Sequence, residues 1–130
     1  MTRTAMVLLA GVALALPGLA CAADAPAKTT AAKGTPLMKK SLGGNPEQIA
    51  EMLMVEYAGG ASSLSHRHDA HVFVYVLEGS LEMQVAGQPE VTLKAGDTFY
   101  ENPTDVHVKS ANASATESAK FLVLKLTNKP

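Results

Sequence analysis

Apolar and polar residues alternate through most of the second half of the chain, and this alternation predicts β-strands. Residues 72–77, VFVYVL, form a β-branched and aromatic run of the kind that pleated sheets prefer. Leu81, Met83 and Val85 then alternate with polar residues, and further strands are predicted around residues 91–93, 98–100 and 121–126. Short strands separated by glycine-containing turns every 8–12 residues or so indicate an all-β antiparallel sandwich or barrel.

The stretch before these strands fits two patterns. Asn45 and Pro46 could begin a helix, with apolar residues following at helical spacing. Residues 51–57 alternate instead, with Leu53, Val55 and Tyr57 on one face, and end at a Gly-Gly breaker. We expect a strand from about Glu51 to Tyr57, with a helical turn before it left open.

The N-terminal residues have the character of an export signal. Arg3 precedes an apolar stretch at residues 5–16, which is shorter than the ~20 residues of a membrane-spanning helix. Small residues around Cys21 then predict cleavage after Ala22, so residues 1–22 are expected to be a secretory signal peptide and the protein periplasmic or secreted. "GLAC" also resembles a bacterial lipobox, which leaves a lipid anchor at Cys21 open.

Composition narrows the possible partners. Residues 23–36 are rich in Ala, Lys, Thr and Pro and are expected to be a flexible linker, which leaves residues 37–130 as one domain. The chain has 11 basic and 12 acidic residues, so it lacks the excess of positive charge that is typical of a nucleic-acid-binding protein.

Cys21 is the only cysteine, so no intrachain disulfide is expected to stabilise the domain. A core this small gains from burying a further face, so a homodimer is expected.

Histidine is the residue type with the most informative placement. His66, His68 and His71 crowd together directly before the apolar run, and His107 lies far along the chain after a turn. In an extended segment His66 and His68 would share one face. With His107 arriving from another strand, three imidazoles could hold one metal ion and leave coordination positions open.

Two segments together resemble the cupins, a family of small jelly-roll β-barrels. The first reads Gly60-ASSLS-His66-Arg67-His68 and continues to YVLEG, and the second reads GDTFYENPTDVHVKSAN. The resemblance covers residues 37–126 and implies a double-stranded β-helix fold. It also implies that His66, His68 and His107 are metal ligands for a divalent ion such as Fe, Mn, Zn, Ni or Cu.

The chain departs from the family pattern at one important position. Val72 stands where the acidic metal ligand is expected, and a valine cannot bind a metal. Glu101 could replace it, because it shares parity with Phe99 and points inward if Phe99 does. His71 could replace it only if a bulge reversed the register, and water is the third candidate.

The resemblance leaves three functions open. The first is an exported metalloenzyme with dioxygenase, isomerase or lyase chemistry on a small molecule, in a pocket lined by Met83, Phe99, Phe121 and Val123. The second is a periplasmic module that binds a metal or small ligand, or no metal, without catalysis. A structural dimer is the third.

Overall fold

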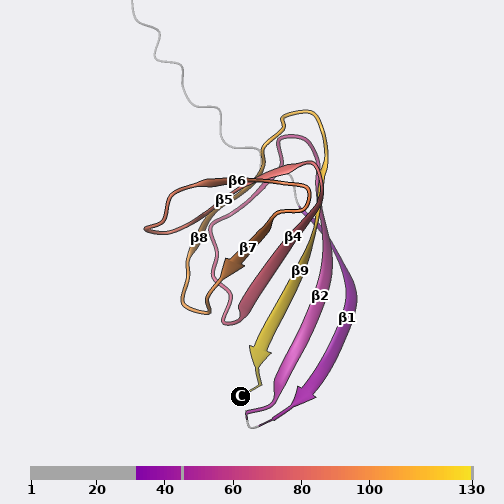
Figure 1. The fold of residues 1–130 in the computed structure, drawn as a ribbon, viewed down its shortest axis with the longest axis vertical. Helices are drawn as coiled ribbons and strands as arrows, with labels where there is room; N and C mark the ends of the chain where they lie inside the picture. The colour runs from indigo at the N-terminus through magenta and orange to yellow at the C-terminus, as the bar shows by residue number, and fades with distance from the viewer. Residues whose placement is uncertain (1–31, 45, 130) are drawn as a thin grey trace, which may run out of the picture.

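Two antiparallel β-sheets packed face to face make up the described part of the chain, residues 32–44 and 46–129 of the computed structural model. The larger sheet has the order β1-β2-β9-β4-β7, and the smaller has the order β3-β8-β5-β6 (Figure 1). The strands are β1 (Lys33–Gly43), β2 (Gln48–Tyr57), β3 (Ser62–Ser63), β4 (His71–Glu78), β5 (Ser80–Val85), β6 (Val91–Lys94), β7 (Thr98–Glu101), β8 (His107–Asn112) and β9 (Ala119–Asn128).

The all-β antiparallel fold predicted from the alternation is confirmed, and so is the jelly roll that the resemblance implies. Strands that are distant in the sequence lie side by side, as β9 does between β2 and β4. Within the described ranges there is no helix, and so none that is long and apolar enough to cross a membrane.

The first two strands differ from the expectation. β2 begins at Gln48, after a turn at Pro46 and Glu47, so the strand starts three residues before the expected Glu51 and leaves no room for a helical turn between them. β1 begins at Lys33, so the linker predicted to reach residue 36 is wrong at its end. All of β1 is exposed, and it is held by pairing with β2, from Lys33 opposite Glu56 to Gly43 opposite Gln48. A strand without a buried face leaves no apolar periodicity to detect. The predicted signal peptide, Cys21 and most of the linker lie outside the described residues.

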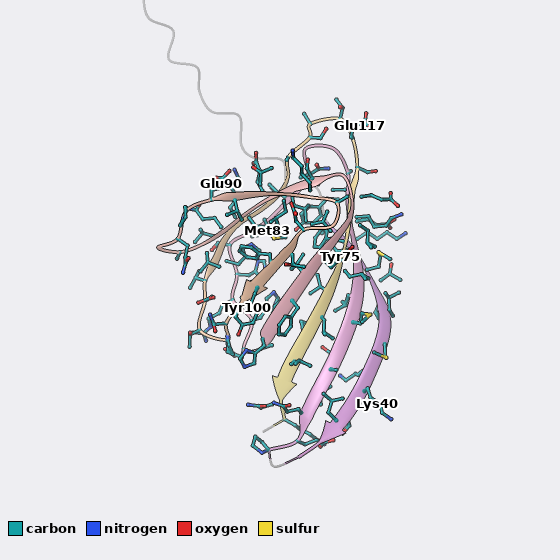
Figure 2. The ribbon with its side chains drawn as sticks, in the orientation of Figure 1. Lys40, Tyr75, Met83, Glu90, Tyr100 and Glu117 are labelled. Carbon is teal, nitrogen blue, oxygen red and sulfur yellow. The ribbon has the colours of Figure 1, made fainter. Side chains whose placement is uncertain are left out.

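The core lies between the two sheets. Alternation in β4 and β5 buries Val72, Val76, Leu81 and Met83 almost completely, and Met83 is labelled in Figure 2. Phe121 from β9 packs edge-to-face on Tyr57 from β2, with ring centroids 5.2 Å apart. These side chains fix the separation of the sheets within which the site is built.

One end of the sandwich is closed by tight loops. Gly79 connects β4 to β5 with a φ of 74°, and a Cβ there would lie 2.6 Å from the carbonyl oxygen of Ser118. The buried amide of Asn112 donates hydrogen bonds to the carbonyl oxygens of Tyr57, Ala58 and Glu117, at 3.4, 3.0 and 2.7 Å. Glu117 marks this end in Figure 2. Strands β4 and β8 begin, and β7 and β9 end, at the opposite end (Figure 1).

Candidate metal centre

Main-chain pairing joins the two histidine motifs. The amide of His66 donates to the carbonyl oxygen of His107 at 3.1 Å, and the amide of His107 donates back at 2.9 Å. The two imidazole rings lie with their centroids 5.2 Å apart. The histidine from the far segment therefore shares a site with the first motif, and the backbone holds the two together.

His68 completes a cluster of three imidazoles. Its ring centroid lies 4.7 Å from that of His66, although both residues belong to the connection between β3 and β4 rather than to a regular strand. The three rings border a cavity of about 190 Å³ between the sheets, which also includes Leu53, Val55, Val74 and Met83 in its wall. His66 and His68 are half-buried, and His107 is buried.

Glu101 points into the same cavity, as its parity with Phe99 predicted. Its side chain is buried, and its Oε1 lies 3.0 Å from Nδ1 of His107. In the sheet it stands directly opposite Val72, the residue at the family's acidic position. Directly opposed residues present their side chains on the same face about 5 Å apart. Strand β7 therefore places a carboxylate beside Val72, where it contacts a histidine.

The hydrogen bonds assign which ring nitrogen is free to act as a ligand. Nδ1 of His66 must be protonated, because it lies 2.7 Å from the carbonyl oxygen of Leu64, which can only accept. Nδ1 of His107 donates to the Glu101 carboxylate. Nε2 of His107 is buried and has no hydrogen-bond partner among the described residues. In both rings Nε2 is therefore the nitrogen whose lone pair can face a metal ion.

The electrostatics of His68 favour the same state. Burial lowers the pKa of His68, and the neighbouring His66 ring lowers it further, with the charge of Lys125 acting in the same direction. A lowered pKa keeps the imidazole neutral, which is the form that binds metals.

These groups fit a metal ion in their chemistry. Three imidazoles suit zinc, copper, iron and nickel, and a carboxylate behind one ligand is the usual support for such a site. Across the described ranges, no three or more His, Cys, Asp or Glu side chains are already arranged as a metal ion would require. Binding would therefore require the rings to turn about their side-chain bonds.

His71 lies apart from this cluster. It is the exposed first residue of β4, and its Nδ1 lies 2.6 Å from the Tyr100 hydroxyl. No bulge reverses the register there, since Val72 beside it is buried. The simple alternation that placed His71 on the opposite face is correct, and His71 cannot supply the missing ligand in this arrangement.

The remaining cavity residues were partly predicted. Met83, Phe121 and Val123 line the cavity as expected. Phe99 does not line it, but stacks on the His107 ring with centroids 5.8 Å apart. The sequence interpretation missed Ser63 and Lys125, which also line the cavity. Lys125 could have been found, because it continues the inward parity of Phe121 and Val123 along β9.

A family model described as a cupin domain matches residues 53–125, more than half of the chain. The chain belongs to the cupin family. This cupin is 35% identical over 57 residues to the pectin degradation protein KdgF of Dickeya dadantii (strain 3937), across 43% of its own length and 51% of KdgF. The match thus spans about half the length of that relative.

Solved structures agree with the family. A cupin superfamily protein from Desulfitobacterium hafniense superposes with a TM-score of 0.62 at 14% identity, covering 78% of this cupin and 83% of that chain. The cupin domain of Schizosaccharomyces pombe Cnp3 superposes with a TM-score of 0.63 at 16% identity. The match covers 75% of this cupin and 61% of that chain. At these identities the likeness shows a common fold.

Proposed function

We propose that this cupin binds one divalent transition-metal ion through His66, His68 and His107 and receives a small molecule in the adjoining cavity. The observation that carries the proposal is the buried Nε2 of His107, which has no partner among the described residues and whose ring is held by Glu101. A buried polar atom without a hydrogen bond costs free energy, and coordination to a metal would remove that cost.

Glu101 has a positioning role in this proposal. Its carboxylate lies against Nδ1 of His107, so the tautomer that it favours carries the proton on Nδ1 and turns the lone pair of Nε2 toward the cavity. The carboxylate also makes the ring a stronger donor to a cation. Glu101 therefore supports the site from behind His107, and water or the bound small molecule would fill the remaining positions.

A metal held in this way supplies Lewis acidity toward a carbonyl or hydroxyl group, or a binding site for dioxygen. The chain's own residues contribute a small, mainly apolar cavity, which limits the size of the molecule. The similarity to KdgF, whose name refers to pectin degradation, supports a small organic molecule as the substrate. Dioxygenase, isomerase and lyase chemistry all fit such a site.

The test is metal content and titration. We expect the purified protein to take up about one equivalent of Ni²⁺, Zn²⁺ or Fe²⁺, and His68→Ala or His107→Ala to lose that equivalent. His71→Ala is the matched control, because it removes a histidine of the same segment that does not line the cavity. A redox-active metal would favour dioxygenase chemistry, and zinc would favour hydrolysis or binding. Failure of the wild-type protein to bind any of these ions would refute the proposal and favour the metal-free binding module.

We further propose that the chain forms a homodimer through the outer face of the larger sheet. Met52, Phe73, Tyr75, Leu122 and Leu124 line one shallow depression on that face. Phe73 and Tyr75 are 43% and 45% exposed. A contiguous apolar patch of this kind is typical of an interface, and a second copy would bury the same patch twice.

Sedimentation velocity tests this interface. The wild-type protein should sediment as a dimer, and Phe73→Lys as a monomer. Val108→Lys, at an exposed apolar residue of the smaller sheet, should remain a dimer. A monomeric wild-type protein would contradict the proposal.

Export is also part of the proposed function, and it rests on residues 1–22. Expression of the full chain in a bacterial host should yield a periplasmic protein whose mass corresponds to cleavage after Ala22. A lipid-modified Cys21 at the new N-terminus would instead indicate an anchored protein. A full-length cytoplasmic product would contradict both forms.

A further inference from the structure

We propose that the cavity binds a small organic carboxylate whose charged group lies against Lys125. The inference deepens the proposed function, in which the cavity receives a small molecule, by naming the chemical class of that molecule. It rests on the charges that line the cavity, on its size and on the two ion pairs of Glu51.

Lys125 is the cationic side chain of the cavity wall. It projects from the inner face of the larger sheet, opposite Glu51 on β2 and Val72 on β4. Its side chain is 27% exposed, so its ammonium group lies where the cavity meets the solvent. The one carboxylate in the wall, Glu101, is engaged by His107. Lys125 is thus the charge best placed to meet an entering ligand.

The present partner of Lys125 can release it at little cost. Glu51 accepts from Lys125 at 3.1 Å and also from Lys39 at 2.7 Å. When a ligand carboxylate takes over Lys125, Glu51 keeps its shorter ion pair with Lys39. Two lysines sharing one carboxylate leave a half-compensated cation, and that cation borders the cavity.

The cavity sets the size of the ligand. Its volume of about 190 Å³ is somewhat larger than a buried cavity of about 150 Å³ that accommodates benzene. Its inner wall is mainly aliphatic and aromatic, with Val55, Val74 and Val123 among its members. An apolar body of roughly six to nine non-hydrogen atoms with one carboxylate matches both the wall and the cation. Ser63, whose buried hydroxyl has no partner within the described chain, could meet a second polar group.

Benzoate and benzamide are suitable probes, because they share a shape and differ in charge. Their dissociation constants would be measured by ligand-observed NMR on metal-stripped protein at pH 8, so that neither a metal nor a protonated histidine attracts the carboxylate. We expect benzoate to bind about tenfold more tightly than benzamide. Lys125→Gln should abolish this preference, and Lys125→Arg should retain it. Lys120→Gln is the matched control and should also retain it, because it removes a lysine of the same strand that pairs with Glu78 and does not line the cavity.

Equal binding of the two probes by the wild-type protein, or a preference that survives in Lys125→Gln, would overturn the proposal. The outcome is separable from that of the metal proposal. Lys125→Gln should still take up one equivalent of Ni²⁺, and metal-stripped His68→Ala should still prefer benzoate. If the wild-type protein binds no metal but its preference for benzoate depends on Lys125, the metal proposal fails and the carboxylate site stands.

Discussion

Asn112 and His107 stand at opposite ends of β8, and both are buried polar residues. The Asn112 amide donates to three backbone carbonyls, and its Oδ1 accepts from the Ser114 amide at 2.9 Å. His107 has one ring nitrogen against Glu101 and the other without a partner among the described residues. One end of the strand has its side-chain hydrogen bonds satisfied, whereas the other keeps one group free.

The difference separates structural from functional polar groups. A buried group with every hydrogen bond made stabilises the fold and has nothing left to offer a ligand. A buried group with one free nitrogen costs stability and is retained where a ligand can use it. We therefore expect the two ends of β8 to respond differently to substitution.

The largest effect is expected at the closed end. Asn112→Ala removes the donor to three backbone carbonyls, so the free energy of unfolding should fall by about 2–3 kcal/mol. Urea denaturation followed by circular dichroism measures this loss. Asn102→Ala, at an exposed amide that bonds to Asp105, should cost less than about 1 kcal/mol. Equal losses in the two variants would mean that the closed end does not depend on Asn112.

Glu101→Gln tests the support behind His107. The amide keeps the size and an acceptor oxygen but removes the negative charge, so metal affinity should fall by about 10-fold to 100-fold while the protein stays folded. Competition with a chelator of known affinity measures the metal dissociation constant of each variant. Glu90→Gln, which weakens a surface pair with Lys109, should leave the affinity unchanged. An unchanged affinity in Glu101→Gln would remove the positioning role.

Ser63 and Ser110 show the same difference between a hydrogen-bonded and an unbonded buried polar group, at one pair of opposed residues in the smaller sheet. The two residues face each other across β3 and β8, but only the Ser110 hydroxyl is hydrogen-bonded, to Tyr57 at 2.9 Å. Ser110→Ala should lower the free energy of unfolding by about 1–2 kcal/mol. Ser63→Ala should leave it unchanged or raise it by up to about 1 kcal/mol, because a buried hydroxyl without a partner is removed. Thermal denaturation of both variants measures the two changes. A clear loss of stability in Ser63→Ala would contradict the conclusion that its hydroxyl has no hydrogen-bond partner.

The smallest effect on the free energy of unfolding is expected when the pH is lowered. The hydrogen bond from Lys39, and to a lesser extent the one from Lys125, lowers the pKa of Glu51 below its usual 4.5. The folded state then holds the proton less tightly than the unfolded state, so the stabilisation is present above that value and disappears as the pH falls through the folded-state pKa. Screening near the surface keeps the change below about 1 kcal/mol. Unfolding free energies measured from pH 6 to pH 3 should fall less steeply in Glu51→Gln than in Glu117→Gln, a variant in the exposed loop before β9. Parallel curves would show that the pair contributes nothing.

The sequence was sufficient for the fold wherever strands have one buried face. Alternation located β4 and β5 because Val72, Val76, Leu81 and Met83 are buried at every second position. It failed for β1, whose two faces are both exposed and whose place depends on pairing with β2. Tertiary pairing of this kind leaves no local signal in the chain.

The site could be predicted in its residues but only partly in its geometry. Motif spacing singled out His66, His68 and His107, and parity turned Glu101 inward. The contact between Glu101 and His107 could not be derived, because it depends on the register that places Glu101 opposite Val72. Cross-strand register is a property of the folded sheet, and neither strand specifies it alone.

The main-chain bridge between His66 and His107 has a thermodynamic consequence. His66 and His68 are close in the sequence, but His107 joins them only once the segment before β4 has paired with β8, so an unfolded chain offers an ion the local histidines without the third. The free energy that the third ligand adds to metal binding would then stabilise the native state alone. If the proposed site is metal-loaded in the cell, depleting the cell of transition metals should shorten the lifetime of the folded protein as well as empty the site.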